Sequence, residues 1–257
     1  MTRITIYKVL TVLAFGLMYL FTAFMILIGL PFIYLKRKKA VKFMMRLWAK
    51  SIFLIIGKKV EVQGSKNIHN DLRFILVANH ASLFDIIAIV SVIPDISWFG
   101  HERLLKVPIF RRVLILTDYI PMRKASYRNI KEMITLLKGQ SQKNNIAIFP
   151  EGTRTLSGKI NDFYRGFILL LRSSEIDVLP VTLNGFYSLK PKNRFYIDFG
   201  TSLHLIIHPS IERETLINLN DREIADIVKD KIESAITDNL TISQSEDGDI
   251  NTKLIKA

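Results

Sequence analysis

Hydrophobic residues follow two different patterns along this chain of 257 residues. Long apolar stretches dominate residues 1–56, whereas from about residue 59 short apolar runs alternate with amphipathic segments. Strands that alternate with helices in this way indicate an α/β sheet covered by helices. The sequence therefore predicts a mixed central sheet flanked by helices, preceded by an N-terminal membrane-anchoring helical segment.

The periodicity also predicts where the elements lie. We expect strands at residues 59–62, 74–78, 96–100, 146–149, 178–183 and 195–199, with a further strand or its exit around residues 204–208. We expect helices at residues 84–93, 108–115, 126–141, 163–173 and 221–237. The predicted organisation is a membrane anchor and interfacial helix over residues 1–57, an α/β domain over 58–237 and a flexible tail over 238–257.

Residues 9–35 contain no charged side chain. About 20 apolar helical residues cross a bilayer core, so this run can span it with tilt, or enter it and bend near Pro31. Two basic residues precede the run and seven lie within residues 36–50, which predicts that the rest of the chain faces the cytoplasm. The run is too long for a cleaved signal peptide, and no small-x-small site follows it.

Residues 41–56 form a second apolar segment with a basic stripe. Lys42, Arg46 and Lys50 recur every four residues, which places them on one side of a helix. Together with Trp48 and a broad apolar face, the stripe suits a helix in the lipid headgroup layer. The same pattern also fits a helix that packs on the core, and one helix can do both.

Charge and composition limit the classes of partner and of catalytic or metal site that the chain can have. The formal net charge of +13 indicates anionic partners, and the basic run 36–39 directly after the apolar stretch favours a membrane surface. We find no nucleic-acid-binding signature and predict no nucleic-acid partner. The absence of cysteine excludes disulfides, thiolate metal sites and cysteine nucleophiles. His204 and His208 are about 13 Å apart along a strand, so we predict no metal site.

The sequence N-H-A-S-L-F-D at residues 79–85 follows an apolar strand. On a continuous helix His80 and Asp85 would point about 140° apart, so they can meet only across a loop-to-helix junction. Ser82 suits the helix N-cap, with Asp85 as its capping acid. One interpretation is that Asp85 merely caps the helix. The other is that Asp85 fixes the tautomer of His80, whose second nitrogen then takes a proton from a hydroxyl.

The sequence F-P-E-G-T-R at residues 149–154 follows another apolar strand. Gly152 permits a sharp turn, which presents Glu151 and Arg154 near the edge of the sheet. Arg154 is suited to bind a phosphate, although a local ion pair with Glu151 explains the same residues. A short extended run, I-P-M-R, ends at Arg123 within a basic region.

In this order the blocks resemble the lysophosphatidic acid acyltransferase family of glycerolipid acyltransferases. Asn79, His80 and Asp85 match its N-H-x-x-x-x-D block, and the run ending at Arg123 matches its second block. Residues 149–154 match its F-P-E-G-T-R block in full, and residues 178–181 match its fourth, a short apolar strand with a proline. The resemblance spans roughly residues 41–210.

The resemblance implies a membrane-anchored enzyme on the cytoplasmic side that acylates the sn-2 hydroxyl of lysophosphatidic acid. His80, oriented by Asp85, would deprotonate that hydroxyl, and acyl-CoA or acyl carrier protein would donate the acyl group without a bound cofactor. Backbone N–H groups near the first block would receive the oxyanion. The remaining residues implied are supporting Asn79 and Ser82, and the acceptor-binding set Arg123, Glu151, Gly152, Thr153 and Arg154.

Two alternatives remain open. One is an acyltransferase for another lysolipid, such as an ornithine-lipid precursor or lysophosphatidylglycerol. The other is a non-enzymatic anchored binder of anionic lipid, against which the intact pair of His80 and Asp85 argues.

Overall fold

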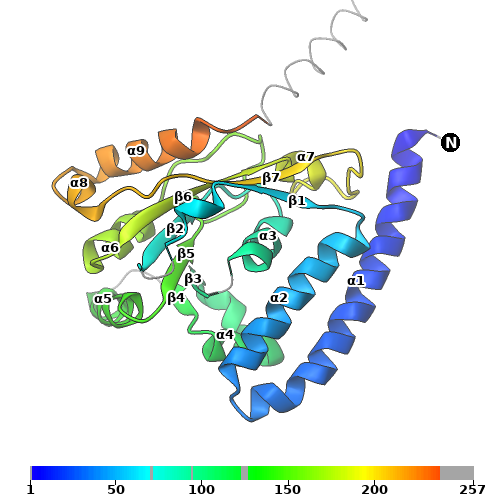
Figure 1. Cartoon of the computed structure of the whole chain (residues 1–257), viewed down its shortest axis with the longest axis horizontal. Helices are drawn as coiled ribbons and strands as arrows, with labels where there is room; N and C mark the ends of the chain where they lie inside the picture. The colour runs from blue at the N-terminus through cyan, green and yellow to red at the C-terminus, as the bar shows by residue number, and fades with distance from the viewer. Residues whose placement is uncertain (1, 70–71, 94, 123–126, 238–257) are drawn as a thin grey trace, which may run out of the picture.

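The protein is built around one mixed sheet with helices on both faces (Figure 1). The computed structural model describes residues 2–69, 72–93, 95–122 and 127–237. Within these residues seven strands lie in the spatial order β1-β7-β6-β2-β5-β3-β4. The neighbouring pairs are parallel except for β6 and β7, which are antiparallel. The predicted mixed α/β fold is confirmed.

The elements follow the predicted order closely. The strands are β1 (Val60–Gln63), β2 (Phe74–Ala78), β3 (Ile96–His101), β4 (Ile120–Met122), β5 (Asn145–Ile148), β6 (Asp177–Asn184) and β7 (Leu203–Ile207). The helices are α1 (Arg3–Tyr34), α2 (Lys38–Ile55), α3 (Phe84–Val92), α4 (Pro108–Leu116), α5 (Tyr127–Ser141), α6 (Arg165–Ser173), α7 (Phe186–Leu189), α8 (Arg213–Ile217) and α9 (Asp221–Glu233). Two short 3-10 turns, η1 (Ser65–Asn67) and η2 (Glu102–Lys106), complete the described elements.

The central strand β2 is buried on both faces of the sheet. Phe74 and Leu76 pack into the core under helices α1, α2 and α3, while Ile75 and Val77 pack into the core under α5, α6 and α9. Alternate residues of a strand point to opposite faces, so a strand covered on both sides needs an uninterrupted apolar run. This explains why the sequence at 74–78 contains no polar residue.

Strands β2 and β5 place two of the sequence blocks side by side. They are parallel neighbours, with Val77 opposite Ile148, so their carboxyl ends reach the same edge of the sheet. The loop after Ala78 carries the first block, and the loop after Ile148 carries the third. Ligands of α/β sheets bind at such edges, where strands lead into loops and helices.

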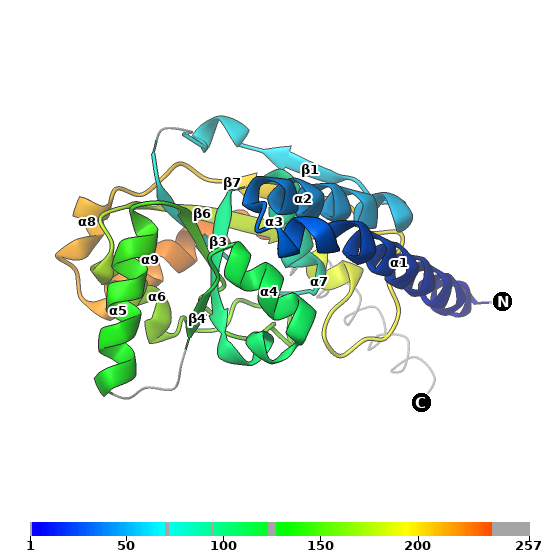
Figure 2. The same ribbon diagram turned by 90° about the horizontal axis from the view of Figure 1, so that it is seen from below.

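Helices α1 and α2 form a hairpin against one side of the domain (Figure 2). Within the described residues α1 is the helix long and apolar enough to cross a membrane, and it continues through Pro31 without ending there. In α2, Ala49, Ile52 and Phe53 are buried, which confirms its core-packing role. Of the basic stripe on α2, Lys42 pairs with Asp95 on the domain, and Arg46 donates a hydrogen bond to a backbone carbonyl.

One predicted strand is wrong. Residues 195–199 form an irregular segment, in which the N–H of Ile197 donates to Thr11 Oγ1 and the N–H of Asp198 donates to the Leu189 carbonyl. The apolar residues that suggested a strand are there because Ile197 is buried beneath α1. Strand β7 occupies the place beside β6, where the sequence predicted a strand or its exit. The predicted boundary at residue 57 falls in the turn between α2 and β1, and the predicted tail lies outside the described residues.

Candidate active site

His80 and Asp85 meet at the junction between β2 and α3. His80 lies in the loop, Asp85 lies in the first turn of α3, and His80 Nδ1 is 2.8 Å from Asp85 Oδ2. The Asp85 side chain is fully buried, and that of His80 is 14% exposed. This is the arrangement that the five-residue spacing permits only across a loop-to-helix junction, and the structure confirms it.

Asp85 also holds the loop itself. The same Oδ2 atom accepts hydrogen bonds from the backbone N–H groups of Ala81 (2.6 Å) and Ser82 (2.8 Å). Capping and orientation of His80 are therefore not alternatives, because one carboxylate oxygen does both. The other oxygen, Oδ1, is buried without a hydrogen-bond partner among the described residues.

The predicted N-cap is wrong by one residue. Leu83 is the N-cap of α3, and the hydroxyl of Ser82 donates a 2.7 Å hydrogen bond to the Lys190 carbonyl. The Ser82 hydroxyl oxygen also accepts a 3.4 Å hydrogen bond from the N–H of Phe84, so this side chain joins the first turn of α3 to the segment after α7. Ser82 supports the first block through these two contacts.

The imidazole of His80 is fixed in orientation and tautomer. A carboxylate only accepts hydrogen bonds, so in the neutral imidazole Nδ1 carries the proton toward Asp85 and Nε2 keeps the lone pair. The ring stacks on Phe149, with centroids 4.0 Å apart, and Phe149 stacks in turn on Trp98. This aromatic stack, which confines the ring to one plane, could not be predicted from the sequence pattern.

Asn79 joins β2 to the end of β6. Its side-chain oxygen accepts from the N–H of Leu183 (2.8 Å), and its amide donates to the carbonyl of the same residue (3.0 Å). Asn79 is nearly fully buried, so these two bonds satisfy groups that water does not reach. The predicted supporting role of Asn79 thus has a physical basis, which is to fix the strand end from which His80 projects.

The carboxylate of Glu151 points into the protein, where backbone and side-chain N–H groups bind it. Its Oε1 accepts from the N–H of His80 (2.7 Å), and its Oε2 accepts from the backbone N–H (2.8 Å) and side-chain amide (2.9 Å) of Asn161. Only 1% of Glu151 is exposed. Burial raises the pKa of Glu151 to about 7, against the opposing effect of the hydrogen bonds from Asn161 and His80. The resemblance implied that Glu151 binds the acceptor, and in the structure both of its carboxylate oxygens accept hydrogen bonds from the protein. Asn161 lies ten residues away in a polar loop, and nothing in the sequence pointed to it.

The rest of the third block forms the turn beside His80. Gly152 has a φ of +65°, and a Cβ there would lie 3.1 Å from the ring of Tyr164, so both the backbone conformation and the space favour glycine. Gly152 and Thr153 are exposed, and Arg154 is half-buried. No described residue forms an ion pair with Arg154, so the alternative of a local pair with Glu151 is not realised. The N–H of Thr155 then donates to the His80 carbonyl at 2.8 Å, which ties the two loops together.

The expected oxyanion donors are not the first amides of the loop. The N–H groups of His80, Ala81 and Ser82 all donate to Glu151 or Asp85, so none of the three is available to an oxyanion. The backbone carbonyl of Lys190 contacts this loop through Ser82. Burial and the charges of Arg154 and Arg194 lower the pKa of the Lys190 side chain. The predicted residue Arg123, which follows β4, lies outside the described residues.

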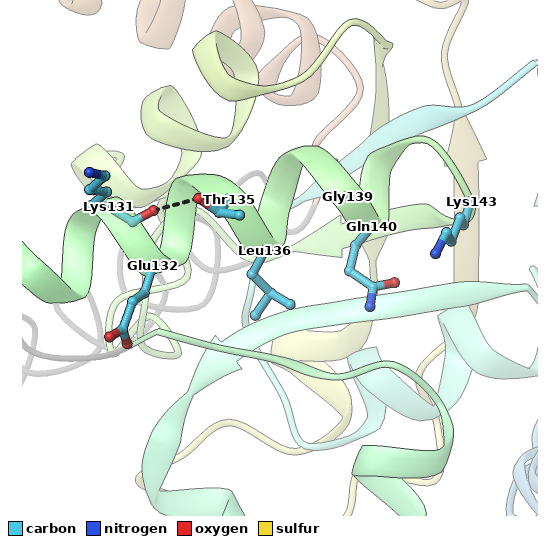
Figure 3. A pocket seen from close by; sticks show the side chains of 7 residues that line it. All are labelled: Lys131, Glu132, Thr135, Leu136, Gly139, Gln140 and Lys143. Atoms are coloured by element: carbon cyan, nitrogen blue, oxygen red, sulfur yellow. Dashed lines mark hydrogen bonds between the residues drawn. The ribbon is translucent and has the colours of Figure 1, made fainter.

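A shallow hollow of about 570 Å³ lies elsewhere, along α5. Figure 3 shows Glu132, Leu136 and Gln140 pointing to one side of that helix. None of the predicted site residues lines it. Its lining residues are Lys131, Glu132, Thr135, Leu136, Gly139, Gln140 and Lys143.

Residues 59–184 match the family model described as Acyltransferase. The chain is 29% identical over 191 residues to a 1-acyl-sn-glycerol-3-phosphate acyltransferase of Borreliella burgdorferi, covering 74% of this chain and 76% of that one. It is 26% identical to the chloroplastic 1-acyl-sn-glycerol-3-phosphate acyltransferase LPAT1 of Arabidopsis thaliana, covering 76% of this chain and 56% of that one. The chain thus spans about half the length of the plant relative.

A solved structure is similar over almost the whole chain. The crystal structure of the 1-acyl-sn-glycerophosphate acyltransferase PlsC from Thermotoga maritima superimposes with a TM-score of 0.74 at 26% identity. The match covers 91% of this chain and 95% of that one.

Proposed function

The chain belongs to the lysophosphatidic acid acyltransferase family of glycerolipid acyltransferases, and from this premise we propose that it acylates the sn-2 hydroxyl of lysophosphatidic acid to give phosphatidic acid. The observation that carries the proposal is the contact between His80 and Asp85, because it leaves His80 Nε2 as a proton acceptor beside the carboxyl edge of the sheet. A base of this kind is worth roughly 10² to 10⁴ in rate.

In the proposed reaction His80 Nε2 takes the proton of the acceptor hydroxyl as its oxygen attacks the thioester carbonyl. The carbon–sulfur bond breaks, and the thiolate leaves with the proton that His80 returns. The buried carboxylate of Asp85 stabilises the imidazolium that forms between these steps. No covalent acyl-enzyme is needed, which agrees with a chain that contains no cysteine.

Arg154 is our proposed ligand for the acceptor phosphate. Its guanidinium has no ionic partner among the described residues, and it lies on the loop that is fastened to His80. Guanidinium groups bind phosphate oxygens through paired hydrogen bonds. We propose that Gly152 and Thr153, which are exposed on the same turn, lie against the glycerol, and that Arg123 contributes a second positive charge.

We propose that α1 lies along the membrane surface. Its first half is fastened to the domain through Thr11 Oγ1, which accepts from the N–H of Ile197, and its end is fastened through Tyr34, which accepts from Arg112. A helix held by the same domain near both ends cannot cross a bilayer unless that domain enters it. Most large apolar side chains of α1 are nevertheless exposed, which suits burial in lipid. We place the catalytic domain on the cytoplasmic side, following the distribution of basic residues.

The test is a panel of acceptors and donors with the purified full chain in neutral detergent micelles. Lysophosphatidic acid, lysophosphatidylglycerol and an ornithine-lipid precursor would each be offered with acyl-CoA and with acylated carrier protein, while thiol release and lipid product are measured. We expect turnover of lysophosphatidic acid, and the donor that supports faster turnover identifies the class of acyl donor that the enzyme uses. Acylation of another lysolipid with none of lysophosphatidic acid would overturn the assignment, and the absence of any acylation would favour a lipid binder.

A further inference from the structure

Helix α4 and the preceding turn η2 expose apolar and basic side chains together. Five large apolar residues are each more than a third exposed: Leu104, Val107, Ile109, Phe110 and Ile115. Four basic residues are exposed among them: Arg103, Lys106, Arg111 and Arg112. Glu102, at the start of η2, is exposed, and no acidic residue lies between positions 103 and 117. Single exposed apolar residues are ordinary, but an unbroken mixture of apolar and cationic side chains is the pattern of a segment that lies in a membrane interface.

The two kinds of side chain share one side of α4. At about 100° per residue, Arg111, Ile115, Arg112 and Ile109 follow one another around the helix at intervals of about 40° to 60°. The centre of this arc lies about 140° around the helix from Leu114, which is the buried residue of the helix. The outer face of α4 therefore carries two arginines and two isoleucines.

This face continues the exposed apolar side of α1. The Arg112 guanidinium donates a 2.7 Å hydrogen bond to the Tyr34 hydroxyl and lies 4.9 Å from the centre of its ring. Tyr34 is 65% exposed, at the end of α1. Lys38, at the start of α2, pairs with Asp118 just after α4. In Figure 1 the turn between α1 and α2 lies at the bottom of the molecule together with α4, away from α8 and α9.

We propose that η2 and α4 form a second membrane-contact surface, which lies on the headgroup layer of an anionic bilayer beside the hairpin of α1 and α2. The basic side chains contact lipid phosphates, and Ile109 and Ile115 enter the apolar boundary. Only three residues separate α4 from β4, so this contact holds the strand of the second block close to the membrane surface. The inference goes beyond the proposed function, because it assigns a membrane contact to η2 and α4, in addition to α1, and does not concern which acceptor the enzyme acylates.

The cysteine-free chain allows a direct test with single labelled cysteines. Ile115→Cys places an environment-sensitive fluorophore on α4, and Ile227→Cys, an exposed site on α9, is the matched control. Both full-length proteins would be added to vesicles of phosphatidylglycerol and phosphatidylcholine. We expect the label at position 115 to shift to the blue, to be quenched by brominated lipid and to lose its quenching by iodide. The label at position 227 should remain in water. A label at 115 that behaves like the control overturns the proposal.

A charge-matched pair of variants tests the basic side chains. Lys106→Gln/Arg111→Gln and Arg222→Gln/Lys231→Gln each remove two exposed positive charges, the first from η2 and α4 and the second from α9. At low salt the first pair should bind the anionic vesicles about 30-fold more weakly than the wild type, and the second should bind within about twofold of it. Equal binding by the two variants would contradict the proposal.

The proposal and the proposed function fail in different ways. Turnover in neutral detergent micelles should be the same in the wild type and both double variants, since neither removes a residue of the active site. If the wild type shows no turnover in micelles, the proposed function is wrong and the proposed membrane contact is unaffected. If acylated carrier protein, and not vesicles, protects the label at position 115 from quenching by iodide, the surface binds an acidic protein and the membrane proposal is wrong.

Discussion

Replacing Glu151 with glutamine separates two roles for this residue, positioning of His80 and binding of the acceptor. The carboxylate offers two acceptor oxygens to three N–H donors, whereas a glutamine side chain offers one oxygen and an NH₂ group that only donates. If the amide oxygen keeps both donors of Asn161, the NH₂ group faces the N–H of His80. A buried N–H without an acceptor costs about 1–3 kcal/mol, so the His80 loop should shift to relieve it.

The expected effect of Glu151→Gln is on kcat. A displacement of about 1 Å in a catalytic group costs on the order of 10²-fold in rate, so kcat should fall about 100-fold. The KM for lysophosphatidic acid should change little, because Glu151 is only 1% exposed and both of its oxygens face the protein. The assay is steady-state thiol release in detergent micelles as lysophosphatidic acid is varied.

Glu175→Gln, an exposed site before β6, is the matched control and should behave like the wild type. A tenfold or larger rise in KM with an unchanged kcat would show that Glu151 contacts the acceptor. In that case the positioning role would have to be abandoned.

Three further outcomes follow from the site. Because burial raises the pKa of Glu151 to about 7 from 4.5, the folded protein binds this proton more tightly than the unfolded chain does. Its contribution to the unfolding free energy is therefore full below pH 4.5 and falls by about 3 kcal/mol as the pH rises through 7. The measurement is the unfolding free energy of the wild type minus that of Glu151→Gln, obtained by denaturation at a series of pH values. A difference that does not change with pH would contradict this prediction. Asn79→Ala should lower the unfolding free energy by about 2–4 kcal/mol, measured by urea denaturation, because it leaves both backbone groups of Leu183 unpaired in the core. Asp85→Asn should lower kcat about 10- to 100-fold with the fold intact by circular dichroism, because an amide still accepts from His80 but no longer stabilises its charged form; an unchanged kcat would remove Asp85 from the mechanism.

The sequence predicted the sheet and the geometry in which His80 meets Asp85 for clear physical reasons. The central strand β2 is buried on both faces, so its uninterrupted apolar run identified it. The spacing of His80 and Asp85 admitted one geometry in which they touch, and helical periodicity alone defined that geometry. In both cases the information was local, within a strand or within one turn of a helix.

The remaining features depend on contacts between distant parts of the chain. Residues 195–199 had the composition of a strand, but Ile197 is apolar because it packs beneath α1. Ser82 had the chemistry of an N-cap, but its hydroxyl binds the Lys190 carbonyl, more than a hundred residues away. The family resemblance assigned Glu151 to the acceptor, and its hydrogen bonds with His80 and Asn161 became visible only with the fold.

The central claim is that His80 removes the proton from the acceptor hydroxyl, and His80→Ala tests it most directly. Thiol release from acyl-CoA or acylated carrier protein would be measured with lysophosphatidic acid, together with vesicle binding and circular dichroism. We expect turnover to fall by roughly 10² to 10⁴ while folding and membrane binding remain those of the wild type. Turnover near that of the wild type in the folded, membrane-bound variant would contradict the mechanism.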